Sequence, residues 1–370
     1  AWIMGVDAPR ALVLATVAYR WGMGADGLAA AFDGDMHAPS PLTEEETARL
    51  AVVDLAAAPG HVRADVPEWA VAQFEAVFGA DWVAEGAALA LRPPLDMRVN
   101  RLRADRDKVL PTLRKFGAVA TPYSPDGMRI DATEGDRRHP NVQVEPAFQK
   151  GWFEIQDEGS QLAAMAVAPK PSERILDLCA GAGGKSLALA SLLRNAGQVT
   201  ATDSDRGRLA PIFERVKRAG AHNIQVREAR ASLSDLAGKM DAVLVDAPCT
   251  GTGTWRRRPD AKWRLTERAL NNRVGEQAAI LDEAAKYVKA GGRLVYVTCS
   301  VFAAENSDQV AAFTGRNEAF VPVAPEEVIR RSGAEPALAG AALLVANGIV
   351  LTPRRAETDG FFVSVMEKRG

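Results

Sequence analysis

The feature that most constrains the fold of this chain is a regular alternation of short apolar runs with helical segments after residue 173. Strand-like runs are expected at 174–178, 198–202, 224–227, 242–245 and 293–298. Between them, helices are expected after the opening turn 179–186 and at 206–219 and 271–288. Strands that alternate with helices are joined by right-handed crossovers into a parallel sheet covered on both faces. The sequence therefore predicts an α/β fold with a doubly wound, mostly parallel sheet, completed by a pair of strands at 349–351 and 361–366.

Two smaller parts are expected ahead of this sheet. Residues 1–90 are rich in alanine with helical apolar spacing, which predicts a helical N-terminal region. Residues 91–155 combine expected strands near 96–99, 119 and 128 with a helix at 106–116, which predicts a small α/β subdomain. Its arginines make the subdomain locally basic, a property that either a solvated surface or RNA contact explains equally well. Residues 156–370 form the main domain.

Composition limits the partners of this chain. Its 370 residues carry 45 Lys and Arg against 47 Asp and Glu, a formal net charge of −2. A nucleic-acid surface, if there is one, must therefore be local. Three cysteines without paired spacing predict neither a disulfide framework nor a metal site, and they fit a cytoplasmic protein. The apolar run Ala11–Ala18 is too short to cross a bilayer, so we expect no membrane association.

A glycine-rich turn follows the first expected strand and opens a helix. It reads Cys179-Ala180-Gly181-Ala182-Gly183-Gly184-Lys185-Ser186. Such a turn lets backbone N–H groups approach a ligand closely, and Asp203, after the second strand, lies where an acid binds nucleoside ribose hydroxyls in folds of this kind. The order strand, turn, helix, strand and acid predicts a nucleoside-containing ligand. The alternative is a tight turn with a capping acid.

A nucleotide triphosphatase is a rival interpretation of the same turn. Gly184-Lys185-Ser186 ends like a phosphate-binding loop, and Asp246 resembles the acid that holds magnesium in such enzymes. However, the pattern G-x-x-x-x-G-K-[ST] requires its first glycine at the position that Cys179 occupies. The turn lacks a residue that a phosphate cradle needs, so this interpretation ranks far lower.

Two thiols follow neighbouring strands of the predicted sheet. Cys249 comes shortly after the run 242–245, in the segment Asp246-Ala-Pro-Cys249, and Cys299 ends the run 293–298. Sequential strands usually neighbour each other, so both thiols are expected at the same crevice. A buried free cysteine is ordinarily a small hydrophobe, but polar neighbours at strand ends favour reactive roles here.

A basic run interleaved with aromatic residues follows Cys249. Its members are Trp255, Arg256, Arg257, Arg258, Lys262 and Trp263. Cationic and aromatic side chains together suit phosphate contact and base stacking, which predicts an RNA-binding surface. The alternative for the individual arginines is a solvent-exposed loop, because runs of charged residues are usually solvated surfaces.

These motifs together resemble the RNA (cytosine-5)-methyltransferases of the Sun type. The resemblance covers about 148–367 and is carried by 177–186, 246–253, 257–260 with 262–263, 298–300 with 305–306, and 359–362. It implies a Rossmann-like, class I methyltransferase domain that binds S-adenosylmethionine, a small RNA-binding α/β subdomain before it, and a truncated helical N-terminal domain. Three departures are the Gly181-Ala182 pair where the family usually has Ala-Pro, Arg227-Glu228 where Gly-Asp is common, and the short helical region.

The resemblance also implies residue roles. Cys299 attacks carbon 6 of cytosine, Asp246 bonds the N3–N4 edge of the ring, and Cys249 helps remove the carbon 5 proton so that the enzyme is released. The cofactor residues implied are Cys179, Ala180, Gly181, Ala182, Gly183, Gly184, Lys185, Asp203, Glu228 and Asp246. The expected substrate is small-subunit ribosomal RNA, with transfer RNA as the alternative within the class. The rival of another class is a catalytically silent RNA-binding factor. We expect a monomer.

Overall fold

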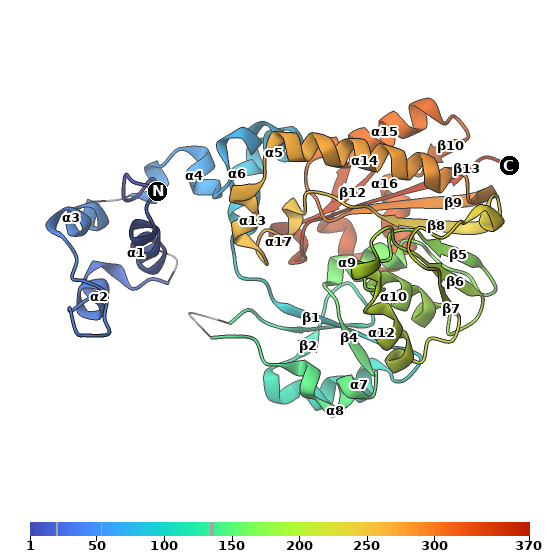
Figure 1. The fold of residues 1–370 in the computed structure, drawn as a ribbon, viewed down its shortest axis with the longest axis horizontal. Helices are drawn as coiled ribbons and strands as arrows, with labels where there is room; N and C mark the ends of the chain where they lie inside the picture. The colour runs from blue at the N-terminus through green and yellow to red at the C-terminus, as the bar shows by residue number, and fades with distance from the viewer. Residues whose placement is uncertain (20, 53, 134–136) are drawn as a thin grey trace. The chain divides into compact units, whose positions relative to one another are not determined.

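A computed structural model describes residues 1–19, 21–52, 54–133 and 137–370, and the chain divides into two compact units. The first is built mainly from Ala1–Asp65, and the second from Val66–Thr133 and Arg138–Gly370 (Figure 1). The helical segment that follows residue 65 therefore belongs to the second unit, although the sequence placed it in one region with residues 1–65.

The first unit is helical. Its helices are α1 (Pro9–Tyr19), α2 (Gly24–Ala31), α3 (Glu44–Val52) and α4 (Gly60–Ala64). Acidic residues fill the first turn of α3, where the helix dipole favours negative charge. One of them, Glu46, also accepts a hydrogen bond from the Nε of Arg10 on α1 at 2.8 Å. Leu14, Leu28 and Leu50 supply a small apolar core of their own.

The second unit begins with helices α5 (Val71–Phe78) and α6 (Trp82–Ala88), followed by a small sheet. The small sheet has the strand order β2 (Val119–Ala120), β3 (Gly127–Ile130), β1 (Leu95–Val99), β4 (Phe153–Ile155), and every pairing in it is antiparallel. Helices α7 (Arg106–Leu113) and α8 (Pro146–Gln149) accompany it. Met97, Val109, Met128 and Phe153 form its buried core.

The large sheet contains the predicted parallel strands. Its parallel strands run in the order β9 (Val288–Thr298), β8 (Met240–Asp246), β5 (Arg174–Asp177), β6 (Gln198–Ala201), β7 (Ile224–Val226). Beyond β9 the antiparallel strands are β13 (Phe361–Lys368), β12 (Gly348–Leu351) and β11 (Leu343–Val345), and β10 (Phe320–Pro322) pairs with β13. The predicted doubly wound α/β fold is confirmed, with its closing strands 349–351 and 361–366 paired.

Helices cover both faces of the large sheet, as Figure 1 shows. One face carries α9 (Glu158–Met165), α10 (Gly184–Leu192), α12 (Ile212–Ala219) and α16 (Pro325–Ser332), and the other carries α14 (Glu267–Ala285) with α15 (Ser307–Arg316). The helix predicted at 206–219 is in fact two, α11 (Arg206–Leu209) and α12, because Pro211 has no N–H to continue the first.

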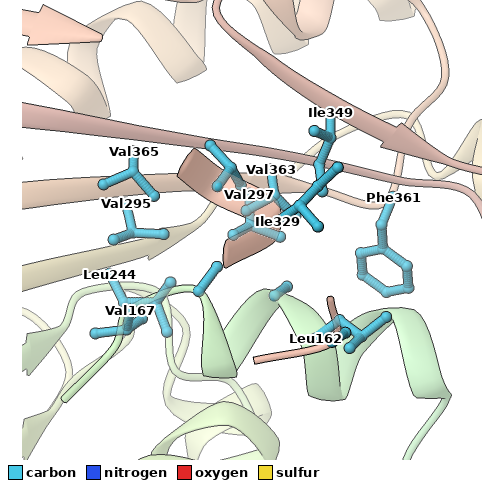
Figure 2. Packing of buried hydrophobic residues seen from close by; sticks show 14 of the residues in the cluster. Leu162, Val167, Leu244, Val295, Val297, Ile329, Ile349, Phe361, Val363 and Val365 are labelled. Atoms are coloured by element: carbon cyan, nitrogen blue, oxygen red, sulfur yellow. The ribbon is translucent and has the colours of Figure 1, made fainter. Parts of the chain in front are cut away.

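The main core lies between the sheet and α9 and α16. Leu162 and Val167, from α9 and the segment after it, face Leu244, Val297 and the neighbouring valines of the central strands (Figure 2). This packing fixes where the parallel strands end, and therefore where the polar side chains that follow them lie. Within the residues that the structure covers, no helix is both long and apolar enough to cross a membrane.

Candidate active site

Polar side chains gather at the carboxyl edge of the parallel strands. Asp177 ends β5, Asp246 ends β8, and Thr298 ends β9 next to Cys299. Asp177 is in register with Leu244 and Asp246 with Val297, so the three strands finish at nearly the same level. Ligands bind at this edge in open α/β sheets.

The glycine-rich turn connects β5 to α10 and lies against Asp203. Gly181 and Gly183 have φ of +50° and +82°, a region that favours glycine, and a Cβ on Gly183 would lie 2.5 Å from Ile212 Cγ1. The Gly181 N–H donates to Asp203 Oδ2 at 2.9 Å, and the Asp205 N–H donates to Asp203 Oδ1 at the same distance. Asp203 therefore holds the shape of the turn.

Other members of the turn are buried or hydrogen-bonded. Burial raises the pKa of the Cys179 thiol, which keeps it neutral. The carbonyl of Ala182 accepts a hydrogen bond from Arg215 Nη1 at 2.8 Å, and the Ala180 N–H donates to the Thr202 carbonyl at 2.9 Å. An added Cβ on Gly181 would be in ordinary van der Waals contact with Arg208 Nη2 at 3.5 Å, so the positive φ, and not crowding, favours glycine there.

Asp177 lies under the turn as a fully buried carboxyl. Its Oδ2 accepts a hydrogen bond from Ser186 Oγ at 2.6 Å, whereas its Oδ1 is buried without a hydrogen-bond partner. Burial raises the pKa of Asp177 to about 7, and the nearby Asp246 carboxylate adds to the shift. A proton on Asp177 is therefore favoured in the folded state.

We expect Asp177→Asn to become more stable relative to the wild type as pH rises. In the folded state Asp177 keeps its proton to about pH 7, but in the unfolded chain only to about pH 4. Its stabilising contribution is thus complete below about pH 4 and is lost as pH rises through 7. Urea unfolding between pH 5 and 8 should show the difference between variant and wild type shifting by about 1–3 kcal/mol. Asp308→Asn, at an exposed carboxyl, is the control, and a flat difference for Asp177→Asn would contradict the prediction.

Lys185 lies beside the catalytic candidate Asp246. Its Nζ is 2.6 Å from Asp246 Oδ2, and it lies 5.3 Å from the centre of the Phe361 ring. Lys185 is buried, while about a third of the Asp246 side chain is exposed. The structure thus joins two residues that were expected at the same ligand and leaves part of the Asp246 side chain exposed.

The two thiols are in contact. Cys249 Sγ lies 3.4 Å from Cys299 Sγ, because β8 and β9 are adjacent parallel strands. The hydrogen bond to Cys299, together with burial, raises the pKa of Cys249 well above that of a free thiol. Cys249 is therefore protonated in the free protein, and its sulfur lies within hydrogen-bond distance of the Cys299 sulfur.

Part of the predicted RNA surface is buried, which corrects the sequence interpretation. Trp255 is only 1% exposed and its ring lies 6.0 Å from that of Phe74. Arg256 is buried too, and its Nε donates to Asp359 Oδ1 at 2.6 Å. Lys262 is 2% exposed. These three side chains face the protein interior, so they are not available to stack on bases or to contact phosphate.

The remaining members of the basic run differ in exposure. Arg257 forms ion pairs with Asp157 and Asp359 at 3.0 and 2.5 Å, which occupy its guanidinium. Arg258 and Trp263 are exposed at the start and near the end of α13 (Pro259–Arg264). They remain candidates for RNA contact. Glu228 is exposed beyond β7, and its contact with a cofactor stays a prediction.

Sequence reasoning missed the polar residues that support the thiols. Glu305 appeared only as part of a motif, and Gln277 not at all, yet both are fully buried and hydrogen-bonded beside Cys249. A polar residue in the middle of an amphipathic helix gives no local signal of this role. Among the described residues, no group of three or more His, Cys, Asp or Glu is arranged to hold a metal ion.

The fold and the site together define a class. A doubly wound sheet with a glycine-rich first turn, an acid after the second strand and paired thiols at the carboxyl edge is the architecture of a Rossmann-like, class I methyltransferase. Residues 164–367 match the model of the 16S rRNA methyltransferase RsmB/F family, and residues 66–134 match the ferredoxin-like domain of RsmF/B-like methyltransferases. The chain belongs to the RsmB/F family.

Individual relatives agree with this assignment. The chain is 34% identical over 309 residues to ribosomal RNA small subunit methyltransferase B of Citrobacter koseri, an alignment that covers 82% of this chain and 66% of that protein. The crystal structure of PH0851 matches with a TM-score of 0.74 at 29% identity, covering 90% of this chain and 70% of the other. A methyltransferase homologue from Pyrococcus horikoshii matches with a TM-score of 0.66 at 25% identity, covering 84% and 97%. The chain spans about two thirds of the length of the curated relatives that it matches.

Proposed function

We propose that this protein is an S-adenosylmethionine-dependent RNA cytosine-5 methyltransferase that acts on 16S ribosomal RNA. The observation that carries the proposal is the contact of Cys249 with Cys299, at 3.4 Å, beside Asp246 at the carboxyl edge of the sheet. Carbon 5 of cytosine is a poor nucleophile, and a thiol that adds at carbon 6 activates it. Two thiols, one to attack and one to assist release, suit this chemistry.

The turn and its acid fit an S-adenosylmethionine site. Backbone N–H groups of the turn and the buried carboxylate of Asp203 are features that suit a nucleoside at this edge. We propose the turn residues 179–185, with Asp203, Glu228 and Asp246, as the cofactor site. When bound there, S-adenosylmethionine supplies an electrophilic methyl group.

The residues of the chain would then act in sequence. The Cys299 thiolate forms a bond to carbon 6 of the target cytosine, while Asp246 bonds its N3–N4 edge and stabilises the charge that develops. After carbon 5 has been methylated, Cys249, which has by then lost its own proton to solvent, accepts the carbon 5 proton. The electron pair of that C–H bond restores the ring double bond as the C6–S bond breaks, which returns Cys299 as a thiolate and releases RNA.

RNA contact is proposed for the exposed part of α13 and its entry. Trp263 is 59% exposed and can stack on an unpaired base, and Arg258 can contact phosphate. The target base must leave its stack to reach thiols at the sheet edge. We also propose that the protein works as a monomer in the cytoplasm, without a metal ion.

Calorimetry combined with a methyl-transfer assay tests this function. We expect S-adenosylmethionine to bind in titration calorimetry, and labelled methyl groups to pass to 16S ribosomal RNA. Bisulfite sequencing of RNA from a deletion strain should show one or more ribosomal cytosines losing protection. Transfer to transfer RNA alone would instead assign the same chemistry to another substrate. RNA binding without cofactor binding would favour a silent RNA-binding factor and overturn the proposal.

A further inference from the structure

Glu305 is a carboxylate with no exposed surface that lies behind the two thiols, in the short helical turn Ala303–Glu305 after β9. Its Oε1 accepts hydrogen bonds from the Thr250 N–H at 2.8 Å and from Gln277 Nε2 at 3.0 Å. Its Oε2 accepts from the hydroxyls of Thr250 and Ser300, both at 2.5 Å. All four donors are neutral groups.

These donors belong to the two segments that carry the thiols. Thr250 directly follows Cys249, and Ser300 directly follows Cys299. Gln277, on α14, also donates to the carbonyl of Pro248 at 3.0 Å, which is the residue before Cys249. One carboxylate therefore bonds both thiol-bearing segments and the helix that supports one of them.

Packing alone does not explain a carboxylate at this position. A buried charge costs free energy unless hydrogen bonds compensate it, and an apolar side chain of similar volume would fill the space without that cost. Other contacts already join the segments, since the Gly253 N–H donates to the Cys299 carbonyl at 3.0 Å and the Val301 N–H donates to Thr252 Oγ1 at 2.9 Å. What Glu305 adds is a fixed separation between the residues that flank the thiols.

Glu305 is itself held in place. The Tyr296 hydroxyl donates to the Glu305 carbonyl at 2.7 Å. The next residue, Asn306, accepts from Thr298 Oγ1 at 2.6 Å and donates to the Ser300 carbonyl at 2.9 Å. The carboxylate thus projects from a rigid support, as accurate positioning requires.

We propose that Glu305 is a positioning residue that fixes Cys249 relative to Cys299. This inference rests on the proposed function, because the separation of the thiols matters only if both serve one reaction. None of the hydrogen bonds of the Glu305 carboxylate described above involves a sulfur atom. It acts through Thr250 and Ser300.

We expect Glu305→Ala to lower kcat by about 100-fold, since a displacement of about 1 Å in a catalytic group can cost that much. The KM for S-adenosylmethionine should change less than about twofold, because the glycine-rich turn is not among the partners of Glu305. Glu305→Gln can keep the hydrogen bonds to both thiol-bearing segments. Its amide oxygen accepts hydrogen bonds as Oε1 does, and the hydroxyls of Thr250 and Ser300 can rotate to accept hydrogen bonds from its NH₂ group. It should recover most of the lost kcat. Glu318→Gln, at an exposed glutamate, is the matched control.

A second readout uses no RNA and no cofactor. Alkylation of the free protein by iodoacetamide, followed by peptide mass spectrometry, measures the reactivity of each thiol. We expect Glu305→Ala to raise the alkylation rate of Cys249 several-fold, since its segment loosens and a nearby negative charge that raises its pKa is removed. Glu305→Gln should keep Cys249 less reactive than the alanine variant does. A double-mutant cycle with Ser300→Ala should show losses in kcat that do not add, because both changes break one bond.

The outcomes separate this inference from the proposed function. Unchanged alkylation and a kcat within twofold of the wild type in Glu305→Ala would overturn the positioning role. So would a loss that Glu305→Gln does not recover, or fully additive losses with Ser300→Ala. If Glu305→Ala does not fold, Ser300→Ala and Glu305→Gln carry the same comparisons. Absence of methyl transfer by the wild type would overturn the proposed function, while the alkylation result would still decide whether Glu305 positions the thiols.

Discussion

Cys299→Ala is expected to abolish both methyl transfer and covalent attachment to RNA, whereas Cys249→Ala is expected to accumulate a covalent complex. If Cys299 is the nucleophile, its removal leaves no sulfur to bond carbon 6. If Cys249 serves only release, its removal lets Cys299 attack and methylation proceed, but the adduct does not collapse. Protein then stays bonded to RNA.

Denaturing gel electrophoresis with labelled RNA distinguishes these variants. We expect a shifted band from Cys249→Ala that requires S-adenosylmethionine to accumulate, and no such band from the double variant. A band from Cys299→Ala, with none from Cys249→Ala, would mean that the two roles are reversed. No band from either variant would leave the covalent mechanism without support.

Arg256→Ala is expected to destabilise the second compact unit by about 1.5–3 kcal/mol, the usual cost of removing one charged hydrogen-bond donor from a buried carboxylate. Each side chain of the Arg256–Asp359 pair is only 4% exposed, and its Nε–Oδ1 distance is 2.6 Å. Burial and the nearby Asp157 already raise the pKa of Asp359, so the carboxylate depends on its arginines. Without Arg256, Asp359 keeps only the ion pair with Arg257 among those described above.

Urea unfolding followed by circular dichroism measures this loss. Arg258→Ala is the matched control, since Arg258 is exposed two residues further on and its removal should change the unfolding free energy by less than about 0.5 kcal/mol. Equal stability of the two variants would contradict the predicted contribution of the Arg256–Asp359 ion pair.

RNA binding should weaken in Arg258→Ala, with a smaller salt dependence, because fewer counterions are released.

Much of the fold could be predicted because its signals are local. The alternation of apolar runs and helices from 174 to 298 reflects burial on both faces of a sheet, which each segment records in its own residues. The proximity of Cys249 and Cys299 also followed from the sequence, since parallel strands that neighbour each other end at one edge. These inferences need only short-range periodicity and one topological rule.

The basic run shows what the sequence by itself could not determine. Trp255, Arg256 and Lys262 have the composition of an RNA surface, but the partners that bury them are distant in the chain: Asp359 is 103 residues after Arg256, and Phe74 belongs to a helix that precedes the sheet. The same holds for Gln277, which reaches Glu305 from the middle of α14. Whether a charged side chain faces solvent or a buried counter-charge depends on contacts between distant segments. Only the tertiary structure decides this, because the local sequence does not indicate which distant segment will pack against a given side chain.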